Sequence, residues 1–490
     1  MLSSALCKRA NFCSAKIQKN IERTKKNVTF DKLRRRDDKE KTKVFSCIIQ
    51  NLIVTLHTNM KTRLYNAKIL SMVEGQEIFD GEIVIEDGRI EHLTPSPSPK
   101  ERGEGLNLKP QTSNLKPNEI DCQGNLLMPG FKNAHAHSGM TMLRSLADDK
   151  PLNEWLNEDI FPVEAKLTGE DIYWASQLAV LEYLTSGITA CFDMYMEQEW
   201  VARAMDDMGF RCVQTGGVND FSKDVRWIDY MYNKYNVPGS LQSYQLGFHA
   251  EYTTNPDNLK LIADVVKKNK APLWVHACET EAEVRGCVER YGMTPVKFLD
   301  SLGMFDYGGG IYHGVWMSEE DYEVMQRRGL YVVTNPGSNT KLASGIAPIS
   351  EYLRRGITVA IGTDGPASNN CLDMFREMFL VAGLAKLRER DAAAIDAREV
   401  LRMATVNGAK AMGLGDCDVL VPGKRADIIM IDLNQPNMQP INNIEKNLVY
   451  SGSKQNVKMT MVNGKILYMD GKFNANVEEI YEKVRGVRRS

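Results

Sequence analysis

The chain has 490 residues, a formal net charge of -2, 43% hydrophobic and 25% charged residues, and a mean hydropathy of -0.34. These values are typical of a globular protein and exclude a collagen-like or low-complexity chain. The longest apolar stretch near the start, Phe45 to Leu56, is too short and too polar to span a bilayer, which argues against a membrane protein. The ten cysteines include no C-x-x-C pair, so we expect free thiols in the cytoplasm.

Charge divides the chain into two parts. Residues 1–59 are strongly basic, whereas the rest of the chain carries more Asp and Glu than Lys and Arg. An acidic body argues against nucleic acid as a partner, because binding to phosphate requires a basic surface. We therefore expect a protein that acts on a small molecule, with neither nucleic acid nor a membrane as partner. A homo-oligomer is compatible with this sequence.

The basic segment, residues 1–59, lacks a clean hydrophobic periodicity. Its Lys- and Arg-rich run from Lys32 to Lys43 would repel itself, which predicts a disordered tail. The segment superficially resembles an organellar transit peptide, but Met60 opens ordered-looking sequence and could itself be a natural start. We expect an inert tail or a mis-set start.

Patterns typical of β-strands occupy both ends of the remaining chain. Ile83 and Ile85 alternate with polar residues before the turn Asp87-Gly88, which predicts a hairpin. Near the other end, residues 426–433 and 457–468 have the apolar content and the flanking turn residues of strands. We expect the two ends to meet in one small β-sandwich domain.

Between these ends, short β-like runs alternate with helical patterns, which is the plan of a parallel sheet with crossover helices. One such helix is predicted from the N-cap Thr168, with Asp171 three residues on, to the terminator Gly187. Eight strands close a (β/α)8 TIM-like barrel of the α/β class. The predicted strands centre on Phe131–Ala136, Ile188–Met194, Arg211–Gln214, Gly247–Ala250, Leu273–Ala277, Gly310–Gly314, Tyr331–Thr334 and Val359–Gly362.

The predicted organisation is therefore a barrel with an accessory β-domain made by both chain ends. In chain order it comprises the basic tail 1–59, the first part of the β-sandwich at 60–130 with a low-complexity insertion at 94–118, the barrel at 131–413, the second part of the β-sandwich at 414–476 and a C-terminal tail at 477–490.

The candidate chemistry lies at the predicted carboxyl ends of the barrel strands, where barrel enzymes bind their substrates. In a strand, residues i and i+2 point the same way, so His135 and His137 present two imidazoles to one side. His276 would add a third nitrogen and Asp364 a carboxylate oxygen. Such a set with an open position suits one catalytic divalent ion, which we expect to be Zn²⁺, with Fe²⁺ as the alternative.

With these residues in place, the sequence resembles the amidohydrolase superfamily. The resemblance starts with the segment from Pro129 to His137, continues through His276, His313 and Thr363-Asp364, and covers nearly everything from Met60 to Phe473. Within the superfamily the sequence is most similar to S-adenosylhomocysteine and 5′-methylthioadenosine deaminases. The resemblance implies one metal ion, because the fourth strand has His249 and no lysine for a binuclear bridge.

The resemblance also implies the catalytic roles. Glu279, three residues after His276, matches the acid/base of the deaminase branch and would protonate the adenine ring nitrogen. A water activated by the metal would attack the ring carbon, and Asp364, assisted by His313, would take the proton of that water. The expected reaction converts an adenine nucleoside to the inosine-type product and ammonia.

Substrate contacts are implied by the same resemblance. Trp155 would pack on the nucleoside, Glu164 would accept hydrogen bonds from the ribose hydroxyls, and His249 would face the substrate. Relatives often have an arginine in the segment Gln214 to Gly217, which here contains none. Arg226 is the candidate to bind the carboxylate of S-adenosylhomocysteine, although its alignment is loose.

Two alternatives remain open from the sequence. Another hydrolysis on the same scaffold, such as guanine or cytosine deamination or triazine dechlorination, would use the same metal ligands and acid. A non-catalytic assembly protein with the same barrel would be expected to lose ligands, and all four are present here.

Overall fold

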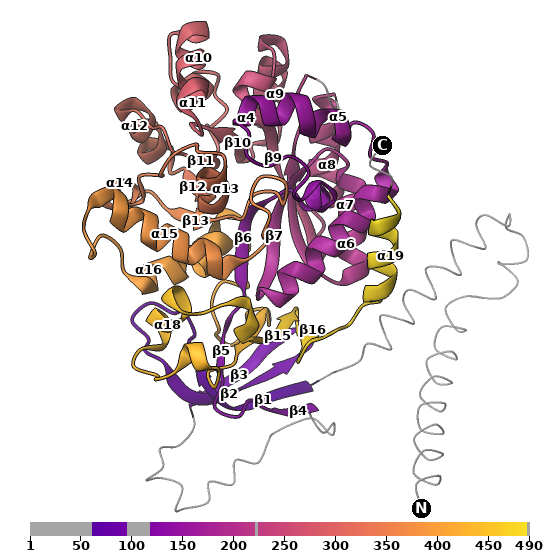
Figure 1. Cartoon of the computed structure of the whole chain (residues 1–490), viewed down its shortest axis with the longest axis vertical. Helices are drawn as coiled ribbons and strands as arrows, with labels where there is room; N and C mark the ends of the chain where they lie inside the picture. The colour runs from indigo at the N-terminus through magenta and orange to yellow at the C-terminus, as the bar shows by residue number, and fades with distance from the viewer. Residues whose placement is uncertain (1–60, 96–117, 221–223, 488–490) are drawn as a thin grey trace, which may run out of the picture. The chain divides into compact units, whose positions relative to one another are not determined.

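A computed structural model describes residues 61–95, 118–220 and 224–487 (Figure 1). The basic tail predicted at 1–59, with its alternatives of a mis-set start or a transit peptide, lies outside the described residues. So does nearly all of the insertion predicted at 94–118. No helix within the described ranges is long and apolar enough to cross a membrane.

Eight parallel strands form the predicted barrel, and its eight predicted strands are confirmed. They follow one another in chain order around the sheet, from β6 to β13. A backbone hydrogen bond of 3.0 Å from the Asp364 N–H to the His135 carbonyl links the residues beyond β13 to β6 and brings the last strand back to the first. The strands are β6 Phe131–Ala136, β7 Ile188–Tyr195, β8 Arg211–Gly216, β9 Gln242–Ala250, β10 Leu273–Ala277, β11 Gly309–His313, β12 Tyr331–Thr334 and β13 Val359–Ile361.

Helices surround this barrel (Figure 1). The best-signalled one, α6 at Gly169–Thr185, starts as predicted with a capping box between Thr168 and Asp171. Gly187 follows it with φ +74°, a conformation that favours glycine. The other helices that follow barrel strands are α7 Gln198–Met208, α8 Arg226–Tyr235, α9 Pro256–Asn269, α10 Glu281–Tyr291, α11 Pro295–Ser301, α12 Glu319–Arg328, α13 Pro336–Lys341, α14 Ile349–Arg354, α15 Met374–Glu389, α16 Ala397–Arg402 and α17 Gly408–Ala411.

The two chain ends meet in a second sheet, as the sequence predicts, and its strands form one hydrogen-bonded sheet of nine (Figure 1). Its central junction pairs β5 Leu126–Pro129 with β14 Ile428–Ile431, so the two ends are joined by backbone hydrogen bonds. The sheet has its own apolar core. The remaining strands are β1 Lys61–Ile69, β2 Phe79–Glu86, β3 Arg89–Pro95, β4 Asn118–Asp121, β15 Val457–Val462, β16 Lys465–Met469 and β17 Lys472–Phe473, and helix α18 Ile444–Tyr450 lies between β14 and β15.

The segment expected as a C-terminal tail, 477–490, is instead largely a helix, α19 at Val477–Gly486. Val477, Ile480, Tyr481 and Val484 recur at the three- and four-residue spacing of one helix face, and this face packs on the main core. Figure 1 shows α19 beside α6, which it contacts. Ile480 is 2% exposed, so burial of this face holds the helix in place.

Candidate active site

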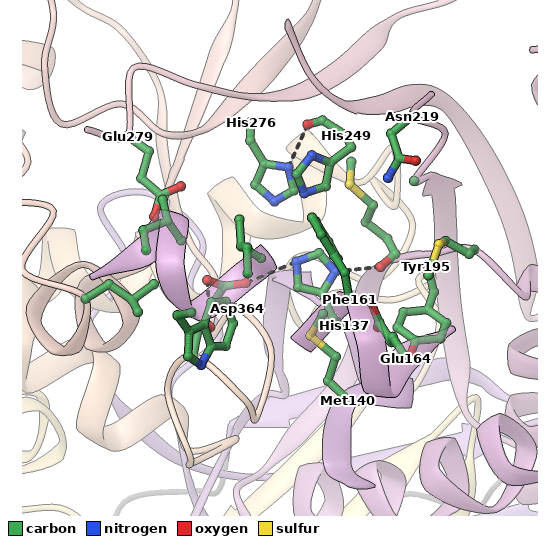
Figure 2. A pocket seen from close by; sticks show the side chains of 18 of the residues that line it. His137, Met140, Phe161, Glu164, Tyr195, Asn219, His249, His276, Glu279 and Asp364 are labelled. Atoms are coloured by element: carbon green, nitrogen blue, oxygen red, sulfur yellow. Dashed lines mark hydrogen bonds and ion pairs between the residues drawn. The ribbon is translucent and has the colours of Figure 1, made fainter. Parts of the chain in front are cut away.

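One pocket opens at the carboxyl ends of the barrel strands (Figure 2). Its walls come from the loops after β6, β7, β8, β9, β10, β11, β12 and β13, so segments far apart in the sequence meet there. Apolar side chains, imidazoles and carboxyl groups all contribute to the wall. The lining residues are His137, Met140, Leu152, Trp155, Leu156, Phe161, Glu164, Met194, Tyr195, Met196, Gly217, Asn219, His249, Tyr252, His276, Glu279, His313, Leu342, Asp364 and Ser368.

The four predicted metal ligands lie together at the base of this pocket. His135, His137, His276 and Asp364 are all buried, and one ligand atom from each lies within 4.8 Å of the others. The Nε2 atoms of His135 and His276 are 3.1 Å apart, and Asp364 Oδ1 lies 3.1 Å from His137 Nε2.

The hydrogen bonds behind these ligands show that the cluster fits a cation. His137 Nδ1 lies 2.6 Å from the carbonyl oxygen of Met194, and His276 Nδ1 lies 2.7 Å from that of His249. Each Nδ1–H donates to its carbonyl, which turns Nε2 toward the cluster as the ligand atom. Imidazole nitrogens and a carboxylate that converge in this way suit a divalent ion, so the chain has a metal-binding site.

Electrostatics differ among the clustered groups. Burial lowers the pKa of His135 to about 3, so its imidazole is neutral at pH 7. Burial also acts to lower the pKa of His137, but its contact with Asp364 outweighs burial and raises this pKa to about 9, so a metal ion must displace a proton from His137 Nε2. Burial opposes ionisation of Asp364, but the neighbouring His135 and His137 imidazoles outweigh it and hold the pKa of this carboxyl well below its usual value. A neutral imidazole and an ionised carboxylate are the forms that bind metal.

The backbone is strained where two of the functional side chains enter the pocket. His313 has φ +74° and Asp364 has φ +61°, in the left-handed region that residues with a Cβ rarely adopt. Such conformations cost about 1–3 kcal/mol each and persist only where the surrounding structure enforces them. Both side chains line the pocket from these strand ends.

Glu279, the predicted acid, is buried but is not among the clustered ligands. Its Oε1 accepts a hydrogen bond of 3.2 Å from Ser344, and its Oε2 lies 3.7 Å from His313 Nε2. The Glu283 carboxylate fixes the backbone beside it, because it accepts from the N–H groups of Cys278 and Glu279. Burial raises the pKa of Glu279, which favours a protonated carboxyl that can donate.

His313 lies between Glu279 and Asp364. Its Nε2 is 3.7 Å from Glu279 Oε2 and 4.0 Å from Asp364 Oδ2. On the other side of the ring, Nδ1 lies 2.8 Å from Asn339 Oδ1, so the Nδ1–H donates to this amide and Nε2 faces the pocket as an acceptor. Asn339 lies in α13, the helix that follows β12.

The predicted substrate contacts Trp155, Glu164 and His249 all line the pocket. Trp155 and Glu164 come from the long loop after β6, which contains α4 Leu152–Glu154 and α5 Phe161–Glu164. Burial lowers the pKa of His249 to about 4, and Thr253 Oγ1 lies 2.9 Å from its Nδ1. His249 therefore presents a neutral imidazole to the pocket.

Arg226, by contrast, is not in the pocket. It is the first residue of α8, its side chain is 90% exposed, and it pairs with Asp224 at 2.6 Å. No Lys or Arg is among the described residues that line the pocket. The structure does not support Arg226 as a substrate contact, because a salt bridge on the surface satisfies its guanidinium.

Several pocket residues were not predicted. Tyr195 and Asn219 follow or end barrel strands, and Tyr252 and Ser344 lie in the loops after β9 and β12. The position of Tyr195 at the carboxyl end of a predicted strand was a usable signal. Ser344 carried none, because its contact with Glu279 joins residues 65 positions apart.

Comparison with known proteins agrees with this arrangement. Residues 126–467 match the model of the amidohydrolase family. A 5-methylthioadenosine/S-adenosylhomocysteine deaminase from Caldanaerobacter subterraneus is 37% identical over 439 residues, which covers 87% of this chain and 97% of the relative. A 5′-deoxyadenosine deaminase from Methanosarcina mazei is 38% identical over 416 residues, which covers 83% of this chain and 92% of the relative.

Solved structures show the same fold. An adenosine deaminase from Xanthomonas campestris with bound zinc superposes with a TM-score of 0.79 at 29% identity, over 87% of this chain and 97% of that one. An atrazine chlorohydrolase from Arthrobacter aurescens superposes with a TM-score of 0.76, over 86% of this chain and 99% of that one, but at 21% identity it supports the fold alone. The match over most of the chain, together with the pocket and its metal-binding cluster, shows that this chain belongs to the amidohydrolase family.

Proposed function

We propose that the protein is a metal-dependent deaminase that converts an adenine nucleoside to the inosine-type product and ammonia. The observation that supports this most strongly is Glu279, a buried carboxyl with a raised pKa that faces the metal-binding cluster without belonging to it. Deamination of a purine needs such a group, because the ring nitrogen must be protonated as water attacks. A hydrolysis that only needs an activated water does not.

The proposed mechanism assigns a task to each polar group of the pocket. His135, His137, His276 and Asp364 would hold a divalent ion, which would lower the pKa of a bound water. Asp364, assisted by His313, accepts one proton of the attacking water, since His313 Nε2 faces the pocket as an acceptor. Glu279 donates its proton to N1 of the adenine ring, and the proton held by Asp364 passes to the exocyclic amine, which leaves as ammonia. The proton of the added hydroxyl returns to Glu279 as the C6 carbonyl forms.

The remaining lining residues are proposed to bind the nucleoside. Trp155 packs on it, the neutral His249 beside His276 faces the purine, and Glu164 accepts hydrogen bonds from the ribose hydroxyls. The names of the relatives support an adenine nucleoside, since they include 5-methylthioadenosine, S-adenosylhomocysteine and 5′-deoxyadenosine deaminases.

We propose a single ion, Zn²⁺, with Fe²⁺ as the alternative. Three imidazoles and one carboxylate with an open position are the ligand set of a mononuclear catalytic site. The fourth strand, β9, places His249 in the pocket and offers no lysine there that could bridge a second ion. The zinc in the Xanthomonas campestris deaminase supports the choice of metal.

The compartment is proposed to be the cytoplasm. All seven cysteines in the described part of the chain are free, and six of them are buried, which suits a reducing environment.

Ammonia release tests this proposal. We expect the zinc-loaded protein to deaminate adenosine, 5′-methylthioadenosine or S-adenosylhomocysteine, and the Glu279→Gln variant to lose about 10²- to 10⁴-fold in turnover while it keeps its metal. The matched control is Glu281→Gln, because Glu281 is exposed at the start of α10 and does not line the pocket. Wild-type protein that holds metal but releases no ammonia from any of the three would contradict the proposal.

A further inference from the structure

Three buried polar atoms on the Glu164 side of the pocket have no hydrogen-bond partner among the described residues. They are Glu164 Oε1, the Tyr195 hydroxyl and Trp155 Nε1. The three side chains are 6%, 3% and 4% exposed, and all three line the pocket. A buried polar group without a partner costs about 1–3 kcal/mol, so three at one place indicate groups kept for a ligand.

The chemistry of these atoms defines the missing ligand. Trp155 Nε1 can only donate. Burial raises the pKa of Glu164, whereas Tyr195 and His137 act to lower it, and the ionised carboxylate can only accept. Burial raises the pKa of Tyr195 well above its usual value and the negative charge of Glu164 raises it further, so its O–H remains a donor. A ligand that matches one acceptor and two donors must itself both donate and accept, which is the property of hydroxyl groups.

The location of Tyr195 adds the geometric argument. Tyr195 is the last residue of β7, and its ring packs against Gly139, where an added Cβ would lie 2.5 Å from the ring. The ring therefore cannot turn toward this side, and its hydroxyl is held beside Glu164. Figure 2 shows Glu164 and Tyr195 together, across the pocket from Glu279.

From these observations we infer that Tyr195 is a substrate-binding residue whose hydroxyl donates to a ribose hydroxyl, the same sugar diol from which Glu164 accepts. This inference rests on the proposed function and extends it, because it makes the pocket selective for a nucleoside with its 2′- and 3′-hydroxyls present. Tyr195 then discriminates between sugars and leaves the chemistry at the base to Glu279.

Binding measured by calorimetry in the Glu279→Gln background tests the inference without turnover. We expect Tyr195→Phe to weaken the binding of adenosine about tenfold, because one hydrogen bond to the sugar is lost. 2′,3′-Dideoxyadenosine lacks the sugar hydroxyls that would accept this hydrogen bond. We expect the substitution to change its dissociation constant less than about twofold. Equal weakening of both nucleosides, or no weakening of adenosine, would overturn the inference.

A second background separates direct contact from an effect through Glu164. If Tyr195 contacts the sugar, Tyr195→Phe still weakens the binding of adenosine when Glu164 is replaced by Ala. If Tyr195 only orients Glu164, the substitution has no further effect in Glu164→Ala, and the inference is wrong. The matched control is Tyr244→Phe, a buried tyrosine outside the pocket lining whose hydroxyl accepts from Gln198 at 3.3 Å. It should leave both affinities unchanged.

The readouts also separate this inference from the proposed function. Selective binding of adenosine that Tyr195→Phe abolishes, together with a wild type that releases no ammonia, would support the sugar subsite and contradict the deaminase. A parent protein that binds neither nucleoside would overturn the inference, and ammonia release from the three proposed substrates would still decide the deaminase.

Discussion

The two ends of the barrel both bury charged groups, but they use them differently. At the amino end, Arg211 on β8 donates to Asp427 just before β14 through two hydrogen bonds of 2.7 and 3.0 Å. The fully buried Lys132 donates to the Gly130 carbonyl and to Thr189, and the Asn463 N–H donates to Asp427. These partners lie on both the barrel and the second sheet, so the cluster joins the two.

At the carboxyl end, buried polar atoms remain without protein partners. Glu164, Tyr195 and Trp155 each present one such atom to the pocket, and His135 Nδ1 has no partner among the described residues. The comparison teaches that burial alone does not identify a site. Charged groups that have partners within the protein stabilise the fold. Buried groups at a pocket that have no partner in the protein are candidates to bind a ligand.

The largest expected effect is a loss of activity when a metal ligand at the carboxyl end of the barrel is replaced. Asp364→Asn replaces the carboxylate of the cluster, and we expect ammonia release to fall by about 10³-fold or more, because the ion contributes several kcal/mol to the transition state. Metal content measured by mass spectrometry should fall with it. A variant that kept both metal and full turnover would show that Asp364 is not a ligand.

The second prediction concerns the contribution of the buried ion pair at the amino end of the barrel to the free energy of unfolding. Asp427→Ala leaves Arg211 buried without its partner, and we expect the free energy of unfolding to drop by about 3–5 kcal/mol in denaturant titrations. The double variant Arg211→Met/Asp427→Leu should recover most of this loss, because it leaves no unpaired charge. Turnover of the folded fraction should not change, and a large loss of turnover would break the proposed separation of the two ends.

The third prediction concerns Glu377, a buried residue of α15 whose carboxyl group contacts the segments that follow β12 and β13. Burial raises the pKa of this carboxyl from 4.5 to about 7. Its carboxylate accepts from the Gly337 N–H and from Asn369, in the segments that follow β12 and β13. Because the folded state holds the proton more tightly than the unfolded chain, the stability present below pH 4.5 is lost as pH rises through about 7.

The measurement is the free energy of unfolding against pH for wild type and Glu377→Gln. The wild type should lose up to about 3 kcal/mol more than the variant between pH 4.5 and 7. Parallel curves for the two proteins would show that Glu377 does not titrate in this range.

The smallest expected effect is at Ser344, which donates to the proposed acid Glu279. Ser344→Ala removes one hydrogen bond of about 1 kcal/mol, so we expect turnover to fall up to about tenfold with metal content and stability unchanged. Ser344→Thr keeps the hydroxyl and should retain more activity than Ser344→Ala. Equal activity in all three proteins would show that this contact does not orient Glu279.

Much of the fold could be predicted because its signals are local. The eight strands appear as short apolar runs, and the capping box of α6 requires only Thr168 and Asp171. The four clustered side chains were also predictable, since His135 and His137 share a strand face and His276 and Asp364 follow strand ends. Carboxyl ends of barrel strands converge, which brings such residues together.

What could not be predicted depends on distant contacts. The helix α19 requires the surface of α6 to bury Ile480, and this surface belongs to a segment hundreds of residues earlier. Arg226 was placed by a loose alignment, and only the folded chain shows that it pairs with Asp224 on the surface. The role inferred for Tyr195 depends on unsatisfied atoms from three separate elements, which no periodicity records.

The most direct test of the central claim is a metal titration of the apoprotein, with ammonia release from adenosine, 5′-methylthioadenosine and S-adenosylhomocysteine as the readout. The account predicts that ammonia release rises with added Zn²⁺ and reaches its plateau at one ion per chain, with one ammonia per inosine-type product formed. No ammonia at any metal ratio, or a plateau only at two ions per chain, would contradict it.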